Sequence, residues 1–96
     1  MNSYYSIFHI EGSINYFEDL EGEIRGITKR PCETKIFIIQ GEIEAKINGT
    51  TFKLKSGTTF EFPENQWHGW ITVVHSKIIQ HIPKYDHRLE QKKTYE

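Results

Sequence analysis

The chain has 96 residues, a formal net charge of −1 at pH 7 and 36% hydrophobic residues, ordinary proportions for one small globular domain. A charge this close to zero provides no basic field for nucleic acid, and no apolar run is long enough to span a membrane. The first residues lack the basic flank and apolar block of a secretory signal. Cys32 is the only cysteine, which excludes an intrachain disulfide and favours a reducing compartment. We therefore expect a cytoplasmic protein that binds neither nucleic acid nor membrane.

The first part of the chain predicts short β-strands. Residues 3–10, 13–17 and 23–28 are strand-like segments rich in aromatic and β-branched side chains. Residues 35–40 are apolar at successive positions, which is typical of a strand covered on both faces. Gly41 follows and predicts a turn into the next strand.

The middle of the chain predicts a β-hairpin. Residues 42–48 and 51–55 both alternate apolar with polar side chains, as half-buried strands do. Asn48-Gly49 stands between them, and this dipeptide is the strongest short-range signal for a hairpin turn. Ser56-Gly57 predicts a second turn before the alternation resumes in residues 58–62.

The segment FEFPENQWHGW, residues 60–70, raises the question of function. Pro63 and Asn65 predict a turn between two strands. His68 should then begin the second strand with its side chain toward the interior, and Trp70 shares that face by alternation while Trp67 points outward.

The last part of the chain predicts one more strand and then a change of composition. The strand is expected over residues 76–82, with His75 in a turn before it. Residues 84–96 are almost all charged or polar, so we expect a single domain over 1–83 and a tail or terminal arm over 84–96. Because turn signals are frequent and no helical stripe is present, the pattern favours an all-β sandwich or barrel.

Two groups of residues resemble the sequence motifs of the cupins. Residues 57–72 fit the second cupin motif at its glycine, proline and histidine, and depart from it at its second glycine and its asparagine. The first motif is matched at its final glycine alone. The resemblance covers residues 25–83 and implies an all-β cupin-type jelly roll, a double-stranded β-helix barrel of antiparallel strands. The matching positions are Gly57, Pro63, His68 and Gly41. The departures are Asn65, Thr72, Thr34, and Thr28 with Arg30, or Ile27 with Lys29 if the longer family spacing applies.

The departures fall on the positions that hold the metal in the family. A cupin metal site consists of three histidines and one carboxylate, and of these positions only His68 keeps its ligand. We therefore expect no metal or other cofactor. Three residues could still complete a site in another register, namely Glu33 through a strand bulge, Cys32 as a thiolate, or His81 from the last strand.

The candidate ligand-binding residues of the barrel are His68, Trp70, Arg30, Phe62 and Thr34. His68 is either a packed histidine between two tryptophans or a group that faces the cavity. In the second case it could form hydrogen bonds or act as an acid or base, because its ordinary pKa lies near neutrality. Arg30 points into the cavity if the strand continues through residues 28–34, where alternation puts Cys32 on the same face. If Pro31 breaks the strand, Arg30 is exposed instead.

Three classes of function follow from these residues. The first is a binding protein for a small, sugar-like or anionic molecule held in the barrel. The second is a metal-independent enzyme, similar to cupin-fold sugar epimerases and isomerases, with His68 as the candidate catalytic residue and Glu61, Tyr16 or His81 as its partner. The third is a metal-dependent oxygenase or isomerase with a degenerate site. Whether the protein is an enzyme is left open, and we rank the classes in this order.

A homodimer is also expected. A barrel of this size has sheet edges to cover, and the cupin resemblance implies pairing through an outer sheet. The apolar strand at residues 3–10 is the expected contributor.

Overall fold

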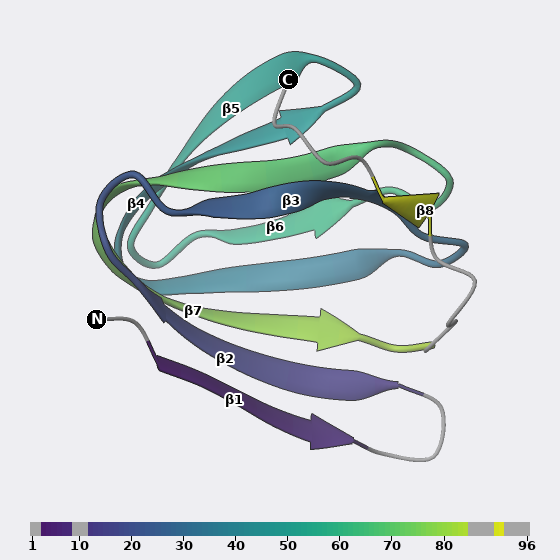
Figure 1. Cartoon of the computed structure of the whole chain (residues 1–96), viewed down its shortest axis with the longest axis horizontal. Helices are drawn as coiled ribbons and strands as arrows, with labels where there is room; N and C mark the ends of the chain where they lie inside the picture. The colour runs from purple at the N-terminus through teal and green to yellow at the C-terminus, as the bar shows by residue number, and fades with distance from the viewer. Residues whose placement is uncertain (1–2, 9–11, 85–89, 92–96) are drawn as a thin grey trace.

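The protein is an antiparallel β structure with no helix among the described residues (Figure 1). The computed structural model describes residues 3–8, 12–84 and 90–91, with side chains described for 5–7 and 12–84. The strands are β1 (Ser3–Phe8), β2 (Ser13–Asp19), β3 (Ile24–Lys29), β4 (Thr34–Ile47), β5 (Thr50–Lys55), β6 (Thr59–Phe62), β7 (His68–Ile82) and β8 (Glu90–Gln91). The predicted all-β jelly roll is confirmed.

Two long strands, β4 and β7, hold the barrel together because each takes part in both of its layers. The first half of β4 pairs with the second half of β7, as at Ile36 and Gln80. β6 extends this layer on one side, and β2 and β1 extend it on the other. The second half of β4 pairs with the first half of β7, as at Ala45 and Trp70, and β5 and β3 flank this second layer.

The long strands pass between the layers at bends, and the turns expected at Gly41 and at His75 are both absent here. Gly41 does not end a strand, because β4 continues through it with a backbone φ of 103°. A side chain at Gly41 would place its Cβ 2.1 Å from Ser76 Oγ, so only glycine lets the two strands approach this closely. His75, which was expected in a turn, lies inside the continuous β7 beside the same bend.

The other predicted turns are confirmed. Asn48 and Gly49 both adopt positive φ, 46° and 84°, as the hairpin turn between β4 and β5 requires. Gly57 has a φ of 87° between β5 and β6. Asn65 takes a left-handed conformation, φ 58°, in the loop that leads into β7 at His68.

The core fills the space between the two layers. Its buried side chains come from β2, β4, β5, β6 and β7, so every layer contributes. At the end where the strands bend, buried Asp19 pairs with Arg25, whose guanidinium lies 4.1 Å from the ring centre of Phe17. The cluster contains Phe17, Ile36, Ile38, Ile43, Ala45, Leu54, Phe62, Trp70 and Ile78.

The described strands nearest the two ends of the chain, β1 and β8, each pair with one strand of the barrel. The predicted strand 3–10 is described as β1 over Ser3–Phe8, and its remainder lies outside the described residues. Within the predicted tail, Glu90 and Gln91 pair with Lys29 and Thr28 of β3. The other residues after 84 lie outside the described part of the chain, so the predicted boundary stays a prediction. The described residues include no helix long and apolar enough to cross a membrane.

Candidate functional site

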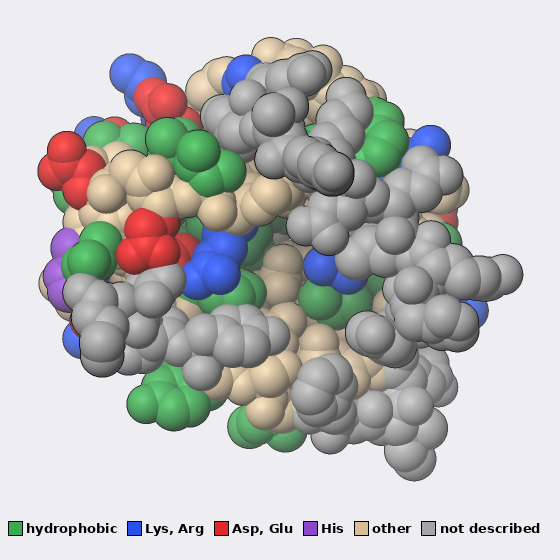
Figure 2. Space-filling model, viewed as in Figure 1, with side chains coloured by type: hydrophobic (Ala, Val, Ile, Leu, Met, Phe, Trp, Pro, Cys, Tyr) green, Lys and Arg blue, Asp and Glu red, His purple; other side chains and the backbone are tan. Residues whose placement is uncertain are grey.

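The barrel is hollowed on the face shown in Figure 2, between β3 and β2 as they lie in Figure 1. Lysine or arginine side chains lie on two sides of this hollow, and hydrophobic side chains line its depth. β2 and β3 both pair with β7 and not with each other, which is why the layers separate here. The interior is therefore the first place to look for a ligand site.

His68 is a buried polar residue of this interior with contacts on both its ring face and its Nδ1. It is the first residue of β7 and is 3% exposed. Its ring stacks on Phe62, with ring centres 4.5 Å apart and an interplanar angle of 17°. Its Nδ1 lies 3.1 Å from the main-chain oxygen of Gln66. Since a carbonyl can only accept, Nδ1 carries the hydrogen and the neutral ring has its lone pair on Nε2.

The surroundings of His68 keep its ring neutral. Burial lowers the pKa of His68 from 6.5 to about 4, the hydrogen bond to Gln66 opposes this by raising the pKa, and the charge of Arg30 lowers it further. At neutral pH the side chain is therefore an acceptor at Nε2 and a base, and not a cation.

Phe62 and Trp70 form an aromatic wall beside His68. Phe62, at the end of β6, lies nearly parallel to the Trp70 ring, with an interplanar angle of 6° and ring centres 6.0 Å apart. Trp70 follows His68 by two positions on β7 and is buried, as the alternation predicts. Trp67 is half-buried, and its ring is approached by Lys29 at 5.6 Å. Both candidate aromatic residues are thus brought to His68.

Three buried polar atoms beside this wall have no hydrogen-bond partner within the described part of the protein. They are Thr34 Oγ1, Trp70 Nε1 and Thr72 Oγ1. A buried polar group without a partner costs about 1–3 kcal/mol, so such groups mark places where water or a ligand completes the hydrogen bonding. Thr34, a candidate from the sequence, belongs to this set, whereas Thr72 was singled out only as a departure from the family motif.

Arg30 lies in the loop between β3 and β4, because the strand does break at Pro31. Of the two alternatives left open for residues 28–34, the continuous strand is therefore absent. Arg30 nevertheless stays half-buried and lies near enough to His68 to lower its pKa. Its main-chain oxygen accepts a hydrogen bond of 2.7 Å from Asn65 N–H, which ties this loop to the loop before β7.

A row of polar side chains crosses the inner face of β1, β2 and β7, and the sequence reading missed it. Ser6 Oγ donates to Asn15 Oδ1 at 2.6 Å, and Asn15 Nδ2 donates to Gln80 Oε1 at 2.9 Å. Asn15 and Gln80 are buried. The register that aligns these three residues was the missing signal, because each looks like an ordinary polar strand residue alone.

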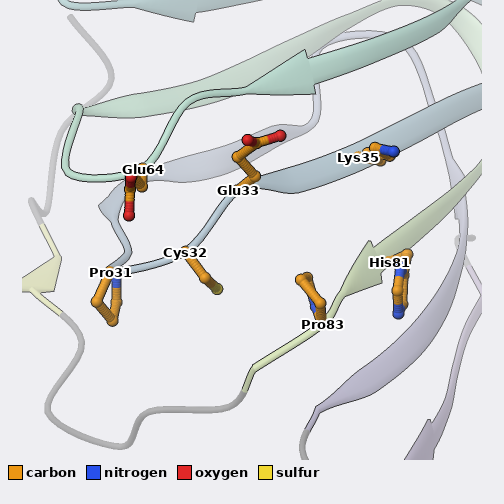
Figure 3. A pocket seen from close by; sticks show the side chains of 7 residues that line it. All are labelled: Pro31, Cys32, Glu33, Lys35, Glu64, His81 and Pro83. Atoms are coloured by element: carbon orange, nitrogen blue, oxygen red, sulfur yellow. The ribbon is translucent and has the colours of Figure 1, made fainter.

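The three substitute metal ligands lie elsewhere. Cys32, Glu33 and His81 line a pocket of about 390 Å³ on the outer side of the barrel (Figure 3). Within it, the side chains of Cys32 and Glu33 point in different directions, and His81 lies across the pocket from both. No three His, Cys, Asp or Glu side chains gather at one point among the described residues. None of these substitutes is placed to join His68, and the expectation of a metal-free protein stays a prediction.

The proposed partners for an acid–base pair with His68 also point away from the interior. Glu61 and His81 are exposed, and Tyr16 belongs to the outward-facing set of β2. The structure therefore does not bring these three possible partners to His68.

Comparison with known proteins agrees with this geometry. The cupin domain family matches residues 20–77, and the chain belongs to that family. No protein of curated function is similar enough in sequence to count as a relative.

Solved structures show the same fold at low sequence identity. A conserved protein of unknown function from Streptococcus pyogenes is 18% identical, with a TM-score of 0.82 over 90% of this chain and 76% of that one. A cupin superfamily protein from Desulfitobacterium hafniense is 16% identical, with a TM-score of 0.82 over 88% of this chain and 79% of that one. The salicylate 1,2-dioxygenase of Pseudoaminobacter salicylatoxidans, solved with gentisate, is 12% identical, with a TM-score of 0.77 over 85% of this chain and 25% of that one.

Proposed function

We propose that the protein binds, in its barrel, a small molecule that carries both hydroxyl groups and a negative charge. The observation that carries this proposal is the set of buried, unsatisfied polar atoms of Thr34, Trp70 and Thr72 beside the neutral ring of His68. A ligand with several hydroxyl groups can donate to the threonine oxygens and accept from the indole N–H. Such a ligand removes an energetic penalty that an apolar one would leave in place.

His68 and Arg30 have complementary tasks in this proposal. The lone pair on His68 Nε2 accepts a hydrogen bond from a ligand hydroxyl and disfavours an anionic oxygen at the same point. The guanidinium of Arg30 attracts the anionic group, a carboxylate or a phosphate. Phe62 and Trp70 offer flat apolar surface to the carbon skeleton of a ring. The ligand class is therefore a sugar acid or a related hydroxylated acid.

The four-ligand cupin metal site does not fit these residues. Threonines and an arginine stand at three of its positions, namely Thr28, Arg30 and Thr34. A threonine side chain is a weak ligand and a guanidinium repels a cation. We therefore propose that binding proceeds without a metal.

An enzyme that moves a proton is the second candidate, and the neutral His68 is the observation that favours it. A buried imidazole with a free Nε2 is a general base at neutral pH without further activation. In a metal-independent isomerase or epimerase this atom would take a proton from a carbon next to a carbonyl group.

We infer a cytoplasmic location from the single cysteine of the sequence. Cys32 is half-buried, and its thiol lies 3.3 Å from the main-chain oxygen of Lys84. A reducing compartment keeps such a thiol free, and cell fractionation with an antibody to the protein tests this.

Isothermal titration calorimetry with two probe ligands tests the binding proposal. D-glucuronate and D-glucose share their ring hydroxyl groups, but glucuronate carries a carboxylate where glucose carries a CH2OH group, so the acid should bind more tightly. His68→Phe keeps a stacked ring and removes the Nε2 acceptor, and it should raise the Kd for glucuronate about tenfold, which corresponds to one hydrogen bond of about 1.4 kcal/mol.

The control is His75→Phe, which changes an exposed histidine outside the barrel. It should leave the Kd unchanged. Equal binding of glucose and glucuronate contradicts the anionic part of the proposal. Equal Kd values for glucuronate in wild type and His68→Phe contradict the role of His68.

A further inference from the structure

The oxygen atom that orients His68 belongs to a loop and not to a strand. His68 Nδ1 lies 3.1 Å from the main-chain oxygen of Gln66, and Gln66 falls in the loop between β6 and β7. Pairing between strands therefore does not hold this oxygen in place. The state of the His68 ring depends on the contacts that fix the loop in front of it.

Asn48 fixes this loop through both its main chain and its side chain. Its main-chain N–H donates to the main-chain oxygen of Trp67 at 2.8 Å. Its side-chain Oδ1 accepts a hydrogen bond from the main-chain N–H of Trp67 at 3.2 Å, and its Nδ2 donates to Gln66 Oε1 at 3.1 Å. Asn48 thus binds the residues that stand directly before His68 in the chain.

The hairpin turn between β4 and β5 does not by itself account for these contacts. Such a turn accepts asparagine, aspartate or glycine because all three tolerate a positive φ, and the φ of Asn48 is 46°. Asn48 is exposed, yet its side chain is directed back to the neighbouring loop. It follows Ile47, which pairs with His68 in the β4–β7 ladder, so the turn lies beside the residues that precede His68.

Asn65, in the same loop as Gln66, offers a comparison. It is also exposed and also has a positive φ, 58°. Its main-chain N–H donates to the main-chain oxygen of Arg30, but its side chain makes no hydrogen bond among the described residues. Asn48 and Asn65 therefore share a backbone conformation and differ in what the side chain does.

The position of the loop decides which nitrogen of His68 carries the hydrogen. A neutral imidazole has one N–H, and the hydrogen bond made by one ring nitrogen sets the state of the other. The main-chain oxygen of Gln66 keeps the hydrogen on Nδ1 and leaves the lone pair on Nε2. If this oxygen moves away, the hydrogen is free to occupy Nε2, and the ring then presents a donor to the interior where it presented an acceptor.

We propose that Asn48 is a positioning residue for the barrel site, because it holds Gln66 where it keeps the Nε2 lone pair of His68 free. Asn48 lies in an exposed turn and acts through Gln66 and Trp67, without touching the ligand. Its effect on binding rests on the proposed function, in which Nε2 accepts a hydrogen bond from a ligand hydroxyl. Asn48 then determines that the site selects a hydroxyl group and not an anionic oxygen at this point.

Long-range proton–nitrogen NMR of the histidine rings tests the proposal, because protonated and unprotonated ring nitrogens differ in chemical shift. In the wild type at neutral pH, His68 should carry its hydrogen on Nδ1. Asn48→Gly keeps the turn but removes both side-chain hydrogen bonds, so a mixture with hydrogen on Nε2 should appear. Asn48→Asp keeps the turn and an acceptor for Trp67 N–H, and the Gln66 amide can rotate to donate to the carboxylate, so the wild-type spectrum should return. The matched control, Asn65→Gly, should also give the wild-type spectrum.

Calorimetric titration with D-glucuronate gives the readout of binding. If the share of His68 rings with a free Nε2 lone pair falls to about one fifth, the apparent Kd rises about fivefold, because only those rings can accept from the ligand. Asn48→Gly should show an increase of this order. Asn48→Asp and Asn65→Gly should keep the Kd of the wild type.

A variant outside the turn guards the test against a folding defect. Gln66→Leu keeps the main-chain oxygen that His68 needs and removes the side-chain partner of Asn48 Nδ2. It should change the His68 spectrum in the same direction as Asn48→Gly but less, because the hydrogen bonds between Asn48 and Trp67 remain.

An unchanged His68 spectrum in Asn48→Gly overturns the proposal. Equal changes in Asn48→Gly and Asn48→Asp overturn it as well, because the side-chain contacts would then not be the cause. The NMR measurement needs no ligand, so the two proposals fail separately. A wild type that does not bind glucuronate but shows the expected His68 spectra contradicts the proposed function and supports the role of Asn48.

Discussion

His68 has two distinct nitrogen atoms, and each serves a different purpose. Nδ1 donates to the main chain of Gln66 and fixes the orientation of the ring. Nε2 is left as an acceptor in a buried, uncharged ring. The structural and functional interpretations of this residue are therefore compatible, because packing on Phe62 is what holds the free lone pair in place.

The lowered pKa of His68 predicts how stability depends on pH. In the unfolded chain the histidine binds a proton near pH 6.5, whereas in the folded protein it does so only near pH 4. Between these values the unfolded state binds more protons, so the free energy of unfolding decreases as pH falls from about 6.5 to about 4. The full loss is up to about 3 kcal/mol, which is the shift converted at 1.36 kcal/mol per pKa unit.

Urea unfolding of the wild type and His68→Phe at several pH values measures this effect. The variant should lose most of the decrease between pH 6.5 and 4, because it has no imidazole at this position. A His75→Phe control should keep the decrease. Parallel pH curves for the wild type and His68→Phe would show that another group causes the loss.

At the scale of single elements, β4 depends on its glycine bend. Gly41→Ala places a Cβ 2.1 Å from Ser76 Oγ and 2.6 Å from the main-chain oxygen of His75, at a φ of 103°. Backbone strain and overpacking together should reduce the free energy of unfolding by about 2–5 kcal/mol. Gly57→Ala is the control, since its φ is 87° but nothing lies within 4 Å of the added Cβ.

Gly57→Ala should reduce the free energy of unfolding by only about 1–2 kcal/mol, because it adds the strain of the left-handed conformation alone. Urea midpoints of the two variants give the comparison. An equal decrease in the free energy of unfolding for both variants would mean that the close approach of Ser76 to Gly41 contributes nothing to the destabilisation.

The elements that the sequence predicted well are those decided by neighbouring residues. The hairpin at Asn48-Gly49 needs only its own alternation and turn chemistry, and both act locally. The bend at Gly41 was read as a turn because the residue that requires a glycine there, Ser76, lies far along the chain. Local patterns do not reveal such a contact.

The same limit applies to the candidate site. His68 and Trp70 were placed from alternation within one strand, and their burial follows that pattern. The polar row through Asn15 and Gln80 depends on pairing between β2 and β7. It also places polar side chains on the inner face, where apolar side chains are usual. The sequence left Arg30 either facing the cavity on a continuous strand or exposed after a break at Pro31. The structure has the break, and the charge of Arg30 nevertheless lowers the pKa of His68.

At the scale of the whole molecule, the two layers are not independent units. β4 and β7 run through both, so the layers share their two longest strands. The layer formed by β1, β2, β7 and β4 has one face toward the interior of the barrel and one face toward the outside. Residues on one strand alternate between them, with Asn15 facing inward and Ile14 and Tyr16 outward.

The pairing of β4 with β7 also sets the order in which the chain can fold. Ile47 and His68 form the pair nearest in sequence, whereas Ile36 and Gln80 are much further apart, and closing a longer loop carries a larger entropic cost. We expect the β4–β5 hairpin to form first, then the Ile47–His68 contact, and the pairing to advance through the Gly41 bend last. Gly41→Ala should therefore accelerate unfolding while leaving the refolding rate nearly unchanged, which stopped-flow fluorescence of the buried Trp70 can measure. A variant that refolds much more slowly than the wild type would instead place the bend early, and the barrel would then close from its crossing point outward.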